Sequence, residues 1–199
     1  MPLSIGEDLL LKNQDQAEIF ESDRRSFLKS GLFLTAALGF WMPDLAFAAK
    51  PPVGREMKLV NAHTGHKFSG EYWYNGRYLP DAFGEIKSVM KDHRTGEKFP
   101  IDPRLMDILY VLQRRAGNSA NFRVFSGYRS PKTNASLRRH SESVAKGSLH
   151  MTGQAVDLEL PGTKLSALKK TAISLKSGGV GYYPRDGFIH LDTGRVRHW

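Results

Sequence analysis

The sequence predicts an α+β fold in which a small antiparallel sheet is flanked by helices. Three observations lead to this prediction. The expected strands and helices do not alternate regularly, as they would in a series of βαβ units. The expected strands at the beginning and at the end of the folded part come in close pairs, each joined by a turn. The hydrophobic fraction of 40% is enough for one core.

The first two strands are expected at residues 57–61 and 67–74, where β-branched and aromatic residues are common. Residues 63–66 contain a glycine and form the turn between them. Asn75-Gly76 follows as a second tight-turn signal. This part of the chain should therefore form a pair of adjacent strands.

Two helices should follow. The first is expected over residues 80–91, in spite of Gly84. The second begins with Asp102 as its N-cap and Pro103 in its first position, and it should end near Gly117. Its apolar stripe consists of Leu105, Ile108, Leu109 and Leu112.

The next segments are predicted to be two strands separated by a basic region. The alternating pattern of residues 121–126 predicts a strand that Gly127 ends. Residues 132–140 form a short basic helix or a loop. Residues 155–160 form a strand that Pro161-Gly162 stops.

The last elements are a helix and a final pair of strands. Residues 164–176 have an amphipathic pattern, and the small residues 177–179 close that helix. Strands are expected at residues 180–183 and 188–192, on either side of the turn at residues 184–187.

Residues 1–48 are expected to be an export signal with a polar N-terminal extension. Arg24-Arg25, followed by Ser26-Phe27-Leu28-Lys29, resembles a twin-arginine signal, although Asp23 replaces the usual Ser or Thr. The apolar run at residues 31–42 is shorter than the ~20 residues that span a bilayer. In Ala46-Phe47-Ala48, the two alanines provide small side chains at the spacing that signal peptidase accepts. We therefore expect a linker at residues 49–56, a folded domain at residues 57–199 and a periplasmic location.

Composition excludes several kinds of chemistry. The chain has no cysteine, so disulfides, thiolate metal sites and a cysteine nucleophile are ruled out. The net charge of +9 would attract a polyanion such as nucleic acid, anionic lipid or a cell-wall polymer, or it is simply a soluble basic surface. A basic stretch precedes the most informative motif; it consists of Lys132, Arg138, Arg139 and Lys146.

The most informative motif contains two histidines and a carboxylate. His150 and Asp157 lie in the stretch from Ser148 to Asp157, and His190 follows 33 residues after Asp157. Catalytic zinc takes three nitrogen or oxygen ligands and keeps one position open. On the strand at residues 155–160, Asp157 points away from the apolar face, so it can enter a cleft. A lone histidine and aspartate at this spacing would often arise by chance, and the full set is more specific.

The stretch Ser148–Asp157 has the pattern S-x-H-x-x-G-x-A-x-D. This pattern resembles that of the zinc peptidases of the D-alanyl-D-alanine carboxypeptidase, lysostaphin and Hedgehog type. Segments 126–130 and 178–194 resemble the carboxypeptidase branch, and the leader and residues 197–199 resemble its murein endopeptidases. The resemblance implies the zinc fold of that type and one Zn²⁺ ion per chain, bound by His150, Asp157 and His190. It also implies peptidoglycan stem peptides and their cross-links as substrate, no nucleic-acid partner, and no stable membrane insertion after processing.

The group that handles the proton stays open at this point. Many such relatives carry Glu or Asp three residues before the last zinc histidine, where this chain has Gly187. We assign catalytic roles to Asp192, which shares a strand face with His190, and to His198. Asp192 either accepts a proton or orients His190, and Asp186 is a further candidate base.

Arg129 and Ser148 are expected to bind substrate. Arg129 follows a strand and a glycine turn, where a guanidinium can hold a carboxylate with two hydrogen bonds. The alternative for Arg129 is a solvated surface charge. Ser148 opens the metal motif.

The sequence therefore predicts a zinc-dependent murein endopeptidase that hydrolyses peptide cross-links. Two other functions remain open. The same fold could carry a D,D- or L,D-carboxypeptidase that trims stem peptides, or a non-catalytic peptidoglycan-binding module.

Overall fold

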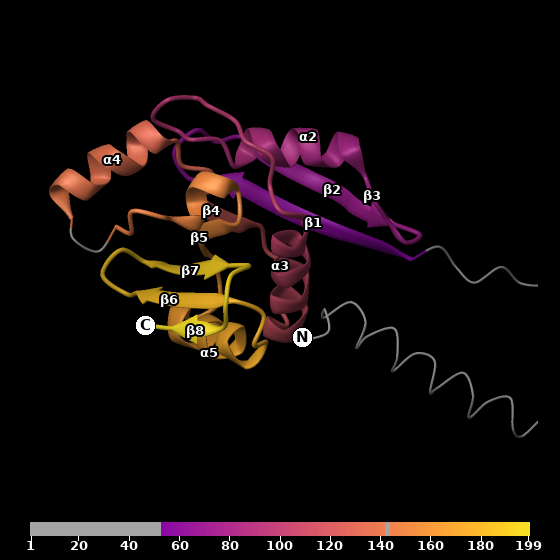
Figure 1. Ribbon diagram of the computed structural model, residues 1–199. Helices are drawn as coiled ribbons and strands as arrows, with labels where there is room; N and C mark the ends of the chain where they lie inside the picture. The colour runs from indigo at the N-terminus through magenta and orange to yellow at the C-terminus, as the bar shows by residue number, and fades with distance from the viewer. Residues whose placement is uncertain (1–52, 142–143) are drawn as a thin grey trace, which may run out of the picture. The chain divides into compact units, whose positions relative to one another are not determined.

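The computed structural model describes residues 53–141 and 144–199 (Figure 1). The predicted export signal at residues 1–48 and the first residues of the expected linker lie outside this range. Within it, strands and helices build an α+β domain, as predicted. No described helix is both long and apolar enough to cross a membrane.

In the described residues, one sheet of eight strands forms the centre of the domain (Figure 1), in the order β3-β2-β1-β4-β5-β7-β6-β8. The strands are β1 Gly54–Asn61, β2 Lys67–Tyr74, β3 Arg77–Tyr78, β4 Phe122–Ser126, β5 Ala155–Glu159, β6 Gly179–Tyr183, β7 Phe188–Asp192 and β8 Arg197–His198. The expectation of a small antiparallel sheet is therefore wrong in two respects, because the sheet is large and mixed.

Two strand pairs are parallel, β1 with β4 and β6 with β8. The β1–β4 pair is parallel because a long crossover joins the two strands. After β2 and β3 the chain passes through two helices and then returns beside β1 as β4. The second arises because the chain leaves β7 and returns on the far side of β6. β3 and β8 have two residues each, too few for a periodic sequence signal.

Four α helices and one 3₁₀ helix accompany the described part of the sheet. They are α2 Pro80–Val89, α3 Pro103–Ala116, α4 Pro131–His140, α5 Leu165–Ser174 and the 3₁₀ helix η1 Leu149–Thr152. α3 begins and ends as predicted: the Asp102 side chain accepts a hydrogen bond from the Arg104 amide, and Gly117 adopts the left-handed conformation.

Some boundaries differ from those expected. β1 starts at Gly54, three residues before the predicted start of the strand. α2 ends at Val89, because the next carbonyl, that of Met90, accepts a hydrogen bond from the Tyr128 amide instead. The basic region at residues 132–140 is helical: α4 is capped by the Ser130 hydroxyl, which accepts a hydrogen bond from the Thr133 amide.

The hydrophobic core joins one face of the sheet to α2, α3 and α5. On β5, Val156 and Leu158 belong to this core, so Asp157 between them faces the opposite side of the sheet. The chemically active side chains of the central strands therefore lie on the face that these helices leave free.

Candidate active site

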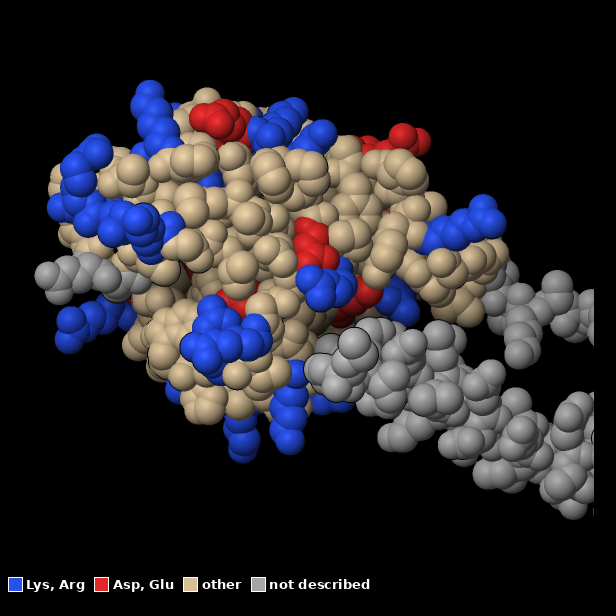
Figure 2. Space-filling view, in the orientation of Figure 1, with Lys and Arg blue, Asp and Glu red and all other residues tan. Residues whose placement is uncertain are grey.

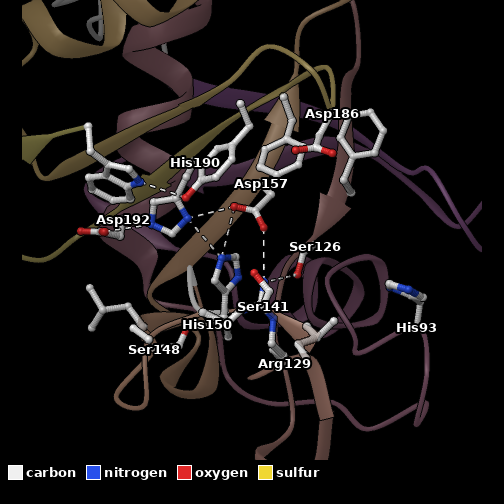
Figure 3. Close-up of a pocket in the computed structure, with 18 of the residues that line it drawn as sticks. His93, Ser126, Arg129, Ser141, Ser148, His150, Asp157, Asp186, His190 and Asp192 are labelled. Atoms are coloured by element: carbon white, nitrogen blue, oxygen red, sulfur yellow. Dashed lines mark hydrogen bonds and ion pairs between the residues drawn. The ribbon is translucent and has the colours of Figure 1, made fainter. Parts of the chain in front are cut away.

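Three predicted ligand residues meet on the free face of the sheet, as Figure 3 shows. His150 comes from η1, Asp157 from β5 and His190 from β7. His150 Nε2 lies 3.2 Å from His190 Nδ1 and 3.2 Å from Asp157 Oδ1. His190 Nδ1 lies 2.9 Å from the same oxygen. All three residues are buried.

The sheet register brings two of them together. Asp157 on β5 stands directly opposite His190 on the antiparallel strand β7, so their side chains project from the same face. His150 arrives by a different route, from the short helix that precedes β5. Gly153 ends that helix with φ of +67°, and this sharp turn lets the chain enter β5 at once.

The outer nitrogen of each imidazole has its own acceptor. His150 Nδ1 lies 2.7 Å from the Gly127 carbonyl oxygen, and His190 Nε2 lies 2.9 Å from Asp192 Oδ2. Each acceptor favours the tautomer in which the outer nitrogen carries the hydrogen and donates it to the acceptor. The inner nitrogen then keeps a free electron pair.

The donor set fits a metal ion. Two nitrogens and one carboxylate oxygen, within 3.2 Å of one another, are the ligand types that a catalytic zinc site uses. A tetrahedral ion with bonds of about 2.0–2.1 Å would place its ligand atoms about 3.3 Å apart, which is close to the observed spacing. Among the described residues, His150, Asp157 and His190 are the group able to hold a metal.

A cavity of about 570 Å³ adjoins this cluster. Its wall includes the predicted residues Arg129, Ser148, Asp186 and Asp192 (Figure 3). His198 is not brought there. It lies on β8 between Arg197 and Trp199, which both line the cavity, so strand alternation turns its side chain away.

The comparisons with known proteins agree with this geometry. The family model described as peptidoglycan L,D-endopeptidase MepK matches residues 48–199. The chain is 41% identical to the peptidoglycan L,D-endopeptidase MepK of Escherichia coli strain K12, over 90% of this chain and 98% of that protein. It is also 41% identical to the probable peptidoglycan L,D-endopeptidase MepK of Haemophilus influenzae strain Rd, over 90% of this chain and 96% of the relative.

The chain belongs to the MepK family of peptidoglycan peptidases. This is a family of metallopeptidases, which agrees with the three convergent ligands. No solved structure was found that matches the chain.

The electrostatics of the cluster favour an anionic Asp157. Burial alone would raise the pKa of Asp157, but the imidazoles of His150 and His190 outweigh it and hold that pKa well below its usual range. For His190, burial acts to lower the pKa, whereas hydrogen bonds to Asp157 and Asp192 raise it above its ordinary value. An ionised Asp157 is the form that binds a cation.

Asp192 is enclosed by donors. Its Oδ1 accepts hydrogen bonds from the amides of Gly179 and Gly194, at 3.0 Å and 2.9 Å. Arg197 donates to both oxygens, at 3.1 Å and 2.7 Å, and His190 occupies Oδ2. The side chain is fully buried, and these bonds hold its pKa well below the usual range although burial acts in the opposite direction. This geometry favours the orientation of His190 over the acceptance of a proton from water.

Arg129 is the cation nearest to the cluster. Its guanidinium Nη2 lies 3.4 Å from Asp157 Oδ2 and 3.4 Å from the Ser126 hydroxyl, both long contacts. Its Nε is buried without a hydrogen-bond partner, and the side chain is only 12% exposed. Burial is the largest influence on its pKa, which is lowered. A solvated surface charge, the alternative considered from sequence, is wrong for this residue.

The predicted basic stretch is mostly exposed. Figure 2 shows Lys and Arg side chains gathered at the end of the domain that α4 forms, where Lys132, Arg138 and Arg139 lie at the surface. Among the described residues that line the cavity, Lys132, Arg138 and Arg139 are absent.

Sequence reasoning missed two contributors to the site. Gly127 was interpreted only as a turn, yet its carbonyl orients His150. Arg197 was noted only as part of a family resemblance, yet it pairs with Asp192 across a short loop. Arg197 lies two residues before Trp199, and this spacing places both side chains on one face of a strand. The signal could not be used, because β8 is too short to be predicted from the sequence.

Proposed function

We propose that the protein is a zinc-dependent endopeptidase that hydrolyses peptide cross-links in peptidoglycan. The observation that carries the proposal is the convergence of His150, Asp157 and His190 beside a cavity, in a chain of the MepK family. The relatives are described as L,D-endopeptidases, which favours an L,D amide as the bond cleaved.

The three ligand residues would hold Zn²⁺ through His150 Nε2, Asp157 Oδ1 and His190 Nδ1. A bound zinc ion polarises a scissile carbonyl and lowers the pKa of a water molecule beside it. The protein's own part is to fix the ligand geometry: the Gly127 carbonyl and Asp192 lock the two imidazole rings, and Arg197 balances the charge of Asp192.

Arg129 supports substrate binding in this proposal. It is a largely buried cation on the cavity wall whose Nη2 makes two long protein contacts, so the end of its guanidinium can bind a substrate oxygen. Ser148, half-buried at the other side of His150, offers a neutral hydroxyl to the same cavity.

We assign the proton acceptor to Asp186 in place of Asp192 and His198. Asp186 is an exposed carboxylate on the β6–β7 turn that lines the cavity, and it precedes His190 by four residues. Asp192 is already engaged by five hydrogen bonds, and His198 points away.

Purified muropeptide dimers provide the decisive test. Incubation with zinc-loaded protein should convert dimers to monomers, detected by mass, and chelation should abolish the conversion until zinc is restored. Loss of a terminal residue without dimer cleavage would instead identify a carboxypeptidase. Unchanged dimers, with binding retained, would identify a non-catalytic module.

We also propose a periplasmic location reached by the twin-arginine route. The support is the Arg24-Arg25 pair in the leader and a peptidoglycan substrate. An Arg24→Lys, Arg25→Lys double variant should accumulate as precursor in the cytoplasm, whereas N-terminal sequencing of exported wild type should begin at Ala49. Normal export of the double variant would exclude this route.

A further inference from the structure

Four aromatic side chains form a continuous row along one wall of the cavity. Trp199 Nε1 donates a hydrogen bond to the Tyr183 hydroxyl at 2.9 Å. The Tyr183 ring stacks on Phe188 with ring centroids 4.8 Å apart, and Phe188 meets Phe125 at 6.0 Å. All four residues line the same cavity as the metal-binding cluster. We call this row the aromatic wall.

Trp199 is held in place although it is 49% exposed. Its amide donates to the Val180 carbonyl, and its carbonyl accepts from the Tyr182 amide, so its backbone is paired with β6. The Arg197 guanidinium lies 5.0 Å from the centre of its ring. The ring fits over β6 only because residue 181 is glycine, where a Cβ would come within 2.8 Å of the indole.

The wall begins at the metal-binding cluster. The Trp199 ring centroid is 5.3 Å from that of His190, with a tilt of 45°. The scissile bond of a substrate would lie at the metal-binding cluster, so a substrate group on the exposed face of the indole lies next to that bond. In a cross-linked stem peptide, the groups next to the scissile bond are amino-acid residues, while the sugars are several residues away.

The rest of the cavity lining is mixed. It carries the polar and basic side chains of Arg94, Arg129, His93, Ser126 and Ser148, together with the apolar Leu137, Val144 and Leu149. Aromatic rings are gathered on the aromatic wall alone, and the other side offers donors for the amide groups of a peptide. An exposed aromatic face gains free energy by covering aliphatic groups.

We propose that the aromatic wall binds the aliphatic side-chain carbons of the stem peptide next to the scissile amide, with Trp199 as the specificity-determining residue. This inference rests on the proposed endopeptidase function. It assigns Trp199 to substrate recognition and gives it no part in orienting His190 as a metal ligand.

Steady-state kinetics test the proposal on a cross-linked peptide dimer, prepared with and without its disaccharides. Trp199→Ala should raise KM about 10-fold for both substrates, with kcat within about twofold and zinc content unchanged. Trp199→Phe should recover most of the loss, because it keeps an aromatic face. Val196→Ala, at a residue that is 60% exposed and outside the cavity lining, is the matched control and should be neutral.

Two kinetic outcomes would overturn the proposal. Weaker zinc binding by Trp199→Ala with unchanged KM would mean that the indole only packs against His190. A loss confined to the substrate that carries sugars would mean that the wall binds glycan.

Fluorescence separates this inference from the enzyme assignment. The protein from Ala49 onward has two tryptophans, so Trp73→Phe leaves Trp199 as the single indole. Titration of this zinc-loaded variant with the glycan-free dimer should shift the emission of Trp199. A shift without cleavage would refute the endopeptidase function and support the binding of the peptide by the aromatic wall. Cleavage without a shift would refute the binding role of the aromatic wall.

Discussion

His190 uses its two ring nitrogens for different purposes. Nδ1 faces His150 and Asp157, while Nε2 lies 2.9 Å from Asp192. A carboxylate on the outer nitrogen fixes the ring and makes the inner nitrogen a better ligand. The enclosed position of Asp192 therefore indicates that its charge acts through His190.

Asp192→Asn tests that role, because it keeps the shape of the side chain and removes its charge. We expect zinc affinity to fall about 10-fold or more, with activity falling in parallel at limiting zinc. Competition with a zinc chelator gives the affinity. Asp186→Asn is the matched control: it should lower kcat by about 10²-fold with zinc affinity unchanged. If the Asp192→Asn protein is inactive but binds zinc with full affinity, Asp192 acts as the base and not through His190.

Arg129 is buried without full compensation, which is costly for stability. We expect Arg129→Met to lower kcat/KM by about 10²-fold, the scale of losing one buried charged contact to the substrate. The unfolding temperature of the zinc-loaded protein should stay the same or rise, since a desolvated charge has been removed. Arg115→Met, on the exposed side of α3, should change neither quantity. A large fall in unfolding temperature would show that Arg129 is structural.

Among the elements, the junction between η1 and β5 places His150 beside Asp157. Gly153 has φ of +67° there, and its carbonyl accepts a hydrogen bond from the Asp102 amide at 3.0 Å. A Cβ at this position would overlap the carbonyl oxygen of Pro100. The segment before α3 and the metal motif therefore fit together only around a glycine.

Gly153→Ala should lower the free energy of unfolding by more than about 2 kcal/mol, through the left-handed backbone and the overlap with Pro100. It should also weaken zinc binding, because His150 would move. Gly84→Ala is the opposite control, since it lies inside α2 with open space around it. It should raise the free energy of unfolding by about 0.5–1 kcal/mol. Chemical denaturation measures both, and equal stability of the two variants would contradict the argument.

At the scale of the whole molecule, Asp92 connects two loops beside the cavity. One carboxylate oxygen accepts the Arg94 amide at 2.9 Å, and the other accepts the Ser130 amide at 2.9 Å, at the start of α4. Burial acts to raise the pKa of Asp92, but hydrogen bonds from Thr133, Ser130 and Arg94 outweigh it and hold that pKa well below the usual range.

This lowered pKa links folding to pH. Because the folded pKa of Asp92 is below the unfolded value of about 3.9, its stabilisation is complete above about pH 4 and is lost as the pH falls further. Asp92→Asn should therefore cost about 2 kcal/mol at neutral pH, and the difference from wild type should shrink in acid. Denaturation of the chelated protein from pH 7 to pH 3 measures this, with Glu85→Gln on the exposed side of α2 as the control. A difference that does not depend on pH would exclude the linkage.

Local patterns, together with the family resemblance, were sufficient to predict that His150, Asp157 and His190 come together. Strand alternation and the ligand preferences of zinc made these three residues candidates, and the resemblance made the set specific. The cap of α3 at Asp102 was predictable for the same reason, since a capping side chain bonds to an amide two residues away. The α+β class followed from the order of these local patterns.

The arrangement of distant segments was decided only by the tertiary structure. The sequence left Asp192 open as a base or as the group that orients His190. Its donors Gly179 and Arg197 lie on β6 and β8, and sequence spacing does not reveal that these strands lie on that side of β7. The same is true of the parallel pairs β1–β4 and β6–β8, which turned the expected small sheet into one of eight strands. Burial and hydrogen bonding across the sheet thus decided that Asp192 is enclosed by donors, and where Trp199 lies.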